Sequence, residues 1–483
     1  MSDKQRNKQH AYVIGVSTLL GAGSKPLRGQ WLEEHDVKDA LLVIPGYAID
    51  TLNDHSGDSN GLGNQARAAL NYIEALREKN ENNLIERRNQ QSQDSIRRSE
   101  LQYICEKRDN RGEPNDIAVH YGTRSGSADA LIDAVRCLIS SNEYSGITVI
   151  SNDLNERLRA NQLGVKAKSY GADIKPFDGW FTFEGENLPD LSSDSTNNYV
   201  LKAIQEQSKA RGIKVPKHAA IRFTKSNTVY IWDTKWRWGD MQNTFKDMKS
   251  YVRALDFTIP RGVDEKRLNL EQKVALDHLQ NPYVSNTFLG GIPGGGKTYL
   301  SLAVFDDNKQ LKNGIVAFRS IKSQAGEDPG LVPGGIDQKM ARYSRNIIDN
   351  LLKIRKQKNA NVRNDGKGEY EALNGIRFSD YGNVEGIHFE DTGVLYDGVH
   401  VLERGALQML LSRDGTNSKF ALTYDSSQNL ATKYISMGTS VDGLALDLLD
   451  NPITAVFRFT ISQCGPNAKL MGDMMAAESP IGL

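Results

Sequence analysis

The sequence predicts an α/β protein with two parallel-sheet domains and a small β-rich module between them. Short apolar runs alternate with helical patterns in the first part of the chain, and a second alternation of this kind begins at about Phe257. Between them, after Tyr170, the sequence is rich in turn residues and has little periodicity, which indicates a boundary. Strands that alternate with helices predict parallel sheets with helical crossovers. At 483 residues the chain is also longer than one core usually organises.

The first domain is predicted over residues 1–175. "AYVIGVSTLL" and "ALLVIPGYAI" have the composition of buried strands. "SADALIDAVRCLI" carries apolar residues at helical spacing, and "NERLRANQLG" is predicted to be a helix that ends at Gly164. The polar stretch at about 77–100 is predicted to be an exposed insertion or a long solvated helix, with a nucleic-acid-binding arm as the alternative.

The second domain is predicted over residues 176–256. Its "AAIRFTKSNTVYIWDTKWRW" indicates short antiparallel strands that carry aromatic residues and lysines. Such a surface can stack bases and hold a nucleic-acid strand. The alternative is that Trp232, Trp236 and Trp238 build a small core.

The third domain, residues 257–483, contains a glycine-rich loop after the predicted strand "NTFLGG". Residues 291–298, "GIPGGGKT", match the pattern G-x-x-x-x-G-K-[ST] without departure. The glycines let backbone N–H groups converge on phosphate oxygens, and the following helix adds its positive end. We expect Lys297 to reach the β- and γ-phosphates and Thr298 to hold Mg²⁺. The phosphate-binding glycines are Gly291, Gly294, Gly295 and Gly296.

Hydrolysis requires further groups at the ends of other strands. An acid that holds the metal is expected at the end of a second strand, and "GVLYDG" supplies Asp397 there. The strand "KFALTYD" ends at Asp425, with Gln428 close behind. We expect these two residues to sense the γ-phosphate, with ordinary turn residues as the alternative.

Bulk composition excludes several classes of protein. Basic and acidic residues balance at 60 each, so net charge demands no nucleic-acid partner. The three cysteines lack metal-ligand spacing, which argues against a disulfide scaffold or zinc site and favours a reducing compartment. There is no apolar run near 18 residues and no signal peptide, so we expect no membrane partner and a cytoplasmic location.

Longer motifs resemble a known family. Residues from about 259 onward are similar to PhoH-like ATPases, most clearly in "AFRSIKSQAGEDPGLVPGGIDQKM" and "LQMLLSRDGTNSKFALTYDSSQ". "VIPGYAIDTLND" and "VISNDLNERLRANQLGVKAKSY" resemble a PIN nuclease domain, and the β-rich stretch lies where PIN–PhoH fusions carry a TRAM-like module. The resemblance implies an ATP-dependent RNA helicase joined to a Mg²⁺- or Mn²⁺-dependent ribonuclease. It also implies single-stranded RNA as partner and a homo-oligomeric ring, with a hexamer as one candidate.

The resemblance to PIN domains assigns metal ligands. This family gathers carboxylates that hold one or two divalent metals, which activate water against a phosphodiester. Three of those acids fall on Asp50, Asp129 and Asp153. The first acid falls on Gly15, which has no carboxylate. Asp54 and Asp133 are the neighbours that we expect to substitute for it.

The resemblance to PhoH-like ATPases assigns Gln272 to adenine, Arg319 to a family arginine and Asp397 to the metal. Several catalytic positions are altered: the water-positioning glutamate, a glutamine and an arginine read Gly398, His400 and Pro466. Glu390, Asp391 and Glu403 are the expected substitutes. The alternative function is a catalytically weakened ATP- and RNA-binding regulator or assembly subunit.

Overall fold

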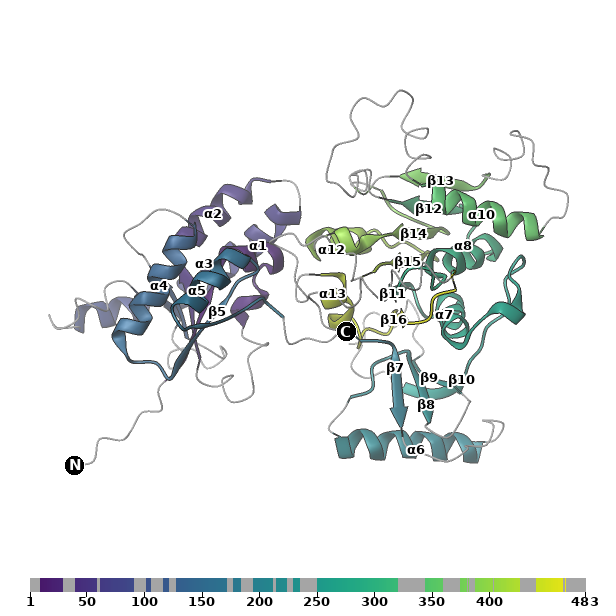
Figure 1. Ribbon diagram of the computed structural model, residues 1–483, viewed down its shortest axis with the longest axis horizontal. Helices are drawn as coiled ribbons and strands as arrows, with labels where there is room; N and C mark the ends of the chain where they lie inside the picture. The colour runs from purple at the N-terminus through teal and green to yellow at the C-terminus, as the bar shows by residue number, and fades with distance from the viewer. Residues whose placement is uncertain are drawn as a thin grey trace, which may run out of the picture. The chain divides into compact units, whose positions relative to one another are not determined.

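A computed structural model shows the chain as two compact units (Figure 1). Unit 1 comprises residues 1–174, 402–409 and 430–443, and unit 2 comprises residues 175–401, 410–429 and 444–483. The structure describes residues 9–28, 40–58, 61–90, 101–105, 116–120, 127–171, 177–183, 194–211, 214–223, 229–234, 250–319, 344–358, 374–379, 381, 387–402, 404–425, 440–463 and 465.

Unit 1 is built on a six-stranded sheet with the strand order β3-β4-β2-β1-β5-β6. Only β3 is antiparallel to its neighbour, β4. The other pairs are parallel, which confirms the predicted α/β class for this part of the chain. The strands are β1 (His10–Ile14), β2 (Ala40–Pro45), β3 (Leu101–Cys105), β4 (Asp116–His120), β5 (Gly146–Ile150) and β6 (Lys166–Lys168).

Helices cover both faces of this sheet. The alternation of side chains along β1 divides the core: Tyr12 and Ile14 pack with α1 (Val16–Ala22), α2 (Gly46–Ser56) and α3 (Gly61–Gln90). Ala11 and Val13 face the opposite way. There they pack with α4 (Ser127–Ser141) and α5 (Leu154–Gln162).

The two apolar runs predicted as strands are each a strand followed by a helix. β1 ends at Ile14 and α1 begins at Val16, while β2 ends at Pro45 and α2 begins at Gly46. Every residue of α1 is buried, so its sequence has no polar face. The prediction of continuous strands was wrong here because periodicity does not separate a buried strand from a short buried helix.

Unit 2 contains a four-stranded sheet, called sheet B, with the order β10-β9-β8-β7. Its pairs are antiparallel except β7 with β8. Phe183, Phe223 and Tyr230 pack with helix α6 (Asp194–Arg211) on one face, and Trp232 is partly buried there. Trp236 and Trp238 lie outside the described residues. The strands are β7 (Trp180–Phe183), β8 (Ala219–Phe223), β9 (Val229–Thr234) and β10 (Ser250–Ala254).

The larger sheet of unit 2, called sheet C, has six parallel strands in the order β13-β12-β14-β15-β11-β16. Helices α7 (Leu270–Gln280), α8 (Lys297–Asp307) and α10 (Arg345–Lys358) lie side by side along it (Figure 1). Because the strands are parallel, their carboxyl ends share one edge, where ligands bind in open α/β sheets. The strands are β11 (Asn286–Gly291), β12 (Ile315–Phe318), β13 (Ile376–Ser379), β14 (Gly393–Asp397), β15 (Lys419–Thr423) and β16 (Thr454–Phe459).

Two shorter helices, α12 (Arg404–Leu411) and α13 (Val441–Asp447), follow β14 in the described part of the chain. Short 3₁₀ helices occur at Lys25–Arg28, Glu265–Arg267 and Val399–Val401. Of the helices in the described ranges, none combines the length and the apolar character that crossing a bilayer requires.

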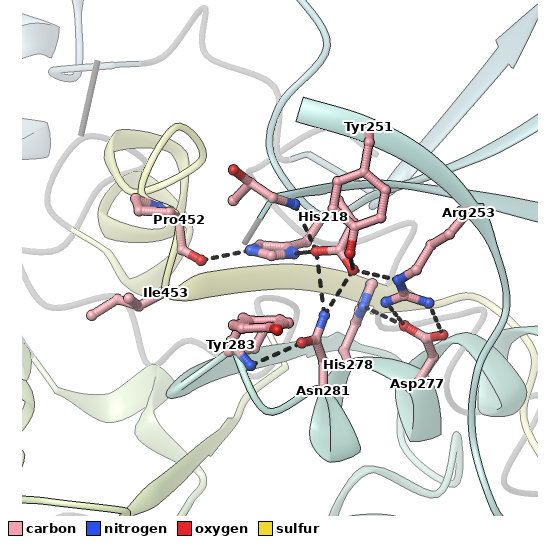
Figure 2. Close-up of polar contacts among 12 residues, drawn as sticks. His218, Tyr251, Arg253, Asp277, His278, Asn281, Tyr283, Pro452 and Ile453 are labelled. Atoms are coloured by element: carbon pink, nitrogen blue, oxygen red, sulfur yellow. Dashed lines mark hydrogen bonds and ion pairs between the residues drawn. The ribbon is translucent and has the colours of Figure 1, made fainter. Parts of the chain in front are cut away.

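A buried ionic network joins sheet B to helix α7 (Figure 2). Arg253 of β10 donates two hydrogen bonds to Asp277, at 2.6 and 2.8 Å, and a third to Asp233 of β9. Asn281, which follows α7, also donates to Asp233. Nδ1 of His218 lies 2.9 Å from Oδ1 of Asp233, although Nδ1 is not aimed for a regular hydrogen bond. Burial raises the pKa of Asp233, but His218 and Arg253 outweigh burial and hold that pKa well below its usual range.

Sheet B and sheet C also share apolar contacts. Ala220 and Ile231, on the face of sheet B opposite α6, belong to the same core cluster as Phe457 of β16. Trp180 of β7 meets the Phe457 ring edge-on at 5.4 Å between centroids. The two sheets of unit 2 therefore pack around a common core.

Candidate active site

The glycine-rich loop joins β11 to α8 at the carboxyl edge of sheet C. Gly291, Gly294 and Gly296 have φ angles of 106°, 78° and 100°, which side-chain-bearing residues rarely adopt. A Cβ atom at Gly291 would also lie 2.1 Å from the carbonyl oxygen of Phe459. A Cβ at Gly295 would lie 2.7 Å from the Phe459 side chain. The loop can therefore follow this path only with glycine at these positions.

Lys297 begins α8 and turns back over the loop. Its Nζ donates to the carbonyl oxygens of Gly291 and Ile292, at 2.6 and 2.8 Å. Burial lowers the pKa of Lys297 to about 8, while the carboxylates of Asp425 and Asp397 oppose this shift. The ammonium group therefore remains the main form at neutral pH, next to the amides that begin α8.

Asp397, at the end of β14, is the centre of a polar cluster. Its Oδ1 accepts hydrogen bonds from the hydroxyl groups of Thr298 and Thr423, both at 2.7 Å. Its Oδ2 accepts from Arg319 at 2.9 Å and from Asn346 at 3.2 Å. The residue is only 6% exposed, so these four donors replace the water that a free carboxylate would bind.

Strand order explains why these side chains meet. β14 and β15 are neighbours, and Asp397 pairs in register with Thr423. Arg319 directly follows β12, the other neighbour of β14. The sequence prediction included Thr298, Arg319 and Asp397 but missed Thr423 and Asn346. A hydroxyl residue at the end of an apolar strand was an available signal for Thr423, whereas nothing in the sequence marks Asn346, in the first turn of α10.

A cavity of about 560 Å³ opens over this cluster, within the size range of small-molecule sites. The loop, the Asp397 cluster and Asp425 all contribute to its lining. A different part of the lining comes from the segment before α7 and from Tyr299 of α8. The residues that line it and that the sequence predicted are Gln272, Gly294, Gly296, Lys297, Thr298, Arg319, Asp397 and Asp425.

Gln272 lines the cavity but uses its amide on the protein. Its Oε1 accepts from the backbone N–H of Asn269, and the Asn269 side chain accepts from the Gln272 N–H, which completes a capping box at the start of α7. Its Nε2 donates to the carbonyl oxygen of Gly295 at 3.0 Å. In the structure the amide thus orients the glycine loop, and the adenine contact stays a prediction. Gln428 lies outside the described residues.

The Asp397 cluster fits a bound Mg²⁺. A hydroxyl and a carboxylate oxygen are the hard ligands that this ion prefers, and Mg²⁺ in nucleotide sites takes few protein ligands because phosphates and waters complete its shell. Thr298 and Asp397 would hold the ion. Thr423, Arg319 and Asn346 orient the carboxylate that faces it.

In unit 1 the space beside Gly15 is filled by a carboxylate from another element. A Cβ at position 15 would lie 2.5 Å from Oε2 of Glu156 and 2.9 Å from the Ser151 side chain. Glu156, in α5, accepts hydrogen bonds from Tyr47 at 2.7 Å and from Ser151 at 2.5 Å. Glu156 is 2% exposed, and these hydroxyl groups satisfy both of its oxygens.

Comparison with known proteins identifies both α/β domains. Residues 266–460 match the family model described as PhoH-like protein, and residues 30–171 match that of the PIN domain. A protein called Protein PhoH2 from Thermobispora bispora is 26% identical over 98% of both chains. Protein PhoH2 from Mycolicibacterium smegmatis is 26% identical over 97% of both, and that from Bacillus subtilis is 28% identical over 42% of this chain and 43% of its own. This chain is a PIN–PhoH fusion.

The PIN domain does not gather the predicted metal acids into one group. Asp50 is exposed on α2, and Asp129 is exposed in the first turn of α4, where it pairs with Arg159 at 2.8 Å. Asp153 caps α5 by accepting from the Asn155 N–H. Across the described ranges, no three side chains of Asp, Glu, His or Cys lie close enough to hold a metal ion together.

A cation lies near the acids that remain in the PIN domain. Burial lowers the pKa of Arg157, and the carboxylates of Asp153 and Glu156 oppose this effect, so the guanidinium lies within range of both charges. The expected substitutes do not complete a site among the described residues: Asp54 is exposed on α2 and joins no group of three potential ligands, and Asp133 pairs with Arg136 at 3.6 Å. The described residues of this domain therefore do not fit the divalent metal of a PIN nuclease.

In the PhoH-like domain, the expected substitutes that the structure describes do not line the cavity. Glu390 and Asp391 precede β14 and do not line it. Glu403 and Pro466 lie outside the described residues. Gly398 and His400 both line the cavity.

Proposed function

We propose that the PhoH-like domain binds ATP with Mg²⁺ and hydrolyses it to drive an RNA helicase. The observation that supports this most is the Thr298–Asp397 hydrogen bond beside Lys297 at the floor of the cavity. When bound, Mg²⁺ would neutralise charge on the phosphates. The chain itself would bind the phosphates through the loop amides and Lys297, and would orient Asp397 through Arg319, Asn346 and Thr423.

Single-stranded RNA is the proposed partner of the motor, and a homo-oligomeric ring is its proposed assembly. The support for both is the PIN–PhoH arrangement, together with the packing of sheet B against the PhoH-like domain. Analytical ultracentrifugation with and without ATP tests the assembly. A single monomeric species in both conditions would contradict the ring.

The activity is tested by measuring ATP binding and ATP hydrolysis with and without single-stranded RNA. We expect RNA to stimulate hydrolysis, and Asp397→Asn to reduce turnover strongly while ATP binding persists through the intact loop. The exposed ion pair Arg345–Asp349 on α10 offers Arg345→Met as the control variant, which should hydrolyse ATP at the wild-type rate. Binding without RNA-stimulated hydrolysis would contradict the motor and leave the weakened regulator.

A second function applies to the PIN domain. The sequence predicted a Mg²⁺-dependent ribonuclease, whereas the contacts of Glu156 favour a domain that holds no divalent metal and does not cleave RNA. A carboxylate held by two hydroxyl groups, with Arg157 close by, needs no metal to balance it. Cleavage of single-stranded RNA in Mg²⁺ or Mn²⁺ that is lost in Asp153→Asn would contradict this second function and restore the nuclease.

A further inference from the structure

Residue 398 directly follows Asp397 and has no side chain in the cavity. Gly398 has a φ angle of 77°, a conformation that a glutamate rarely adopts. Its backbone N–H donates to the Thr423 carbonyl oxygen at 2.9 Å, which fixes the chain direction here. A Cβ at this position would meet one atom within 4 Å, Cε1 of His400 at 3.7 Å. The imidazole of His400 therefore lies next to the space that a side chain of residue 398 would enter.

The hydrogen bonding of His400 defines its tautomer. The backbone N–H of Asp425 donates to Nδ1 of His400 at 3.4 Å, so Nδ1 carries no proton. Burial lowers the pKa of His400, against the opposing charges of Asp425 and Asp397, so the ring is neutral at pH 7. A neutral imidazole has one proton, which must then lie on Nε2.

His400 borders the nucleotide cavity, and its Nδ1 faces the backbone of Asp425. The ring lines the cavity together with Lys297 and Asp425, and it is partly exposed there. Within the part of the chain that the structure describes, Nε2 has no hydrogen-bond partner. The charged groups that act on the ring belong to residues that line the same cavity, namely Lys297, Arg319, Asp397 and Asp425.

We propose that His400 binds the terminal phosphate of ATP by donating from Nε2–H to a γ-phosphoryl oxygen. This inference rests on the proposed ATP binding and adds a residue that distinguishes ATP from ADP. Because Nε2 holds the proton, the ring in this tautomer is a donor at the cavity face and not a base for the attacking water. His400 would thus contact the substrate itself, from a ring that borders the space a side chain at position 398 would enter.

The test compares the affinities of the full-length chain for two Mg²⁺-bound ligands, ADP and the β,γ-imido analogue of ATP, by isothermal titration calorimetry. A hydrogen bond to a charged group corresponds to roughly 10- to 100-fold in affinity. We therefore expect His400→Leu to weaken binding of the imido analogue by about that factor and to leave ADP within about threefold. His400→Gln keeps an N–H donor, and it should recover most of the lost affinity.

Each outcome of this experiment decides one point. Equal losses for both ligands in His400→Leu, or no loss for either, would overturn the role of His400 while ATP binding by the wild type stands. A wild-type chain that binds neither ligand would overturn the proposed function, and this inference with it. Retained ADP binding in the variants shows that the cavity is still folded, so a loss confined to the imido analogue supports the γ-phosphate contact.

Discussion

Replacing Arg253 with methionine should destabilise unit 2 strongly while changing the shape of the side chain little. Arg253→Met keeps an apolar stem of similar length but removes every donor of the guanidinium. Asp277 would lose two hydrogen bonds, at 2.6 and 2.8 Å, and Asp233 would lose one. The two carboxylates are 0% and 1% exposed, so water cannot replace the lost partner.

The size of the effect follows from this burial. Removing one partner of a buried ion pair costs about 3–5 kcal/mol, because the remaining charge stays buried without compensation. For a unit of this size, such a loss lowers Tm by roughly 6–20 °C. Arg253→Met combined with Asp277→Leu removes the uncompensated charge, and the double variant should be more stable than Arg253→Met alone.

Thermal unfolding followed by circular dichroism measures the loss of stability, and hydrogen exchange of the amides in α7 and β10 shows whether the loss is located there. Arg345→Met is the matched control, since its ion pair with Asp349 joins side chains that are 63% and 55% exposed. We expect the control to lie within about 0.5 kcal/mol of the wild type. If Arg253→Met unfolds at the same temperature as Arg345→Met, the buried network of Arg253, Asp233 and Asp277 does not stabilise unit 2.

Three further predictions concern single sites. Gly15→Ala should lower the free energy of unfolding by roughly 1–3 kcal/mol, because its Cβ would meet Glu156. In a double-mutant cycle measured by urea unfolding, Gly15→Ala and Glu156→Ala should have non-additive effects, and additive effects would contradict the close contact. Burial lowers the pKa of His278 to about 3, so between pH 6.5 and about pH 3 the unfolded chain takes up a proton that the folded chain does not, and the free energy of unfolding should fall by about 1.4 kcal/mol per pH unit in that window. His278→Leu should flatten that acid slope, and an unchanged slope would assign it to other groups. Thr423→Val removes one donor to Asp397, so ATP turnover should fall about tenfold with ATP affinity nearly unchanged, whereas wild-type turnover would show that this donor is dispensable.

Motifs could be predicted where the residues that form them are consecutive in the sequence. The loop of residues 291–298 needs positive φ angles and amides at the start of a helix, and both are written in consecutive residues. Asp397 could be predicted because a carboxylate at the end of a buried strand in a parallel sheet lies at the ligand edge. The partners of Asp397 depend on strand order and on the placement of α10, which no local pattern encodes.

The side chains that lie beside the altered positions Gly15 and Gly398 could not be predicted from the sequence, for a related physical reason. Gly15 and Gly398 were recognisable as missing carboxylates, and near neighbours were the expected substitutes. In the structure the space beside Gly15 is taken by Glu156, which is distant in sequence, whereas the space beside Gly398 is bordered by Cε1 of His400 at 3.7 Å. Both contacts depend on side-chain direction at the junction of a strand and a helix, which residue spacing alone does not determine.

Helix α7 has a mechanical consequence for how the two sheets of unit 2 move. At its first turn Gln272 holds the Gly295 carbonyl, and at its far end Asp277 holds Arg253 of sheet B. Its 11 residues form a rod of about 16 Å, with no glycine or proline at which it could bend. Because no hinge interrupts the helix, a displacement of the glycine-rich loop would move α7 as a rigid body, and sheet B would move with it.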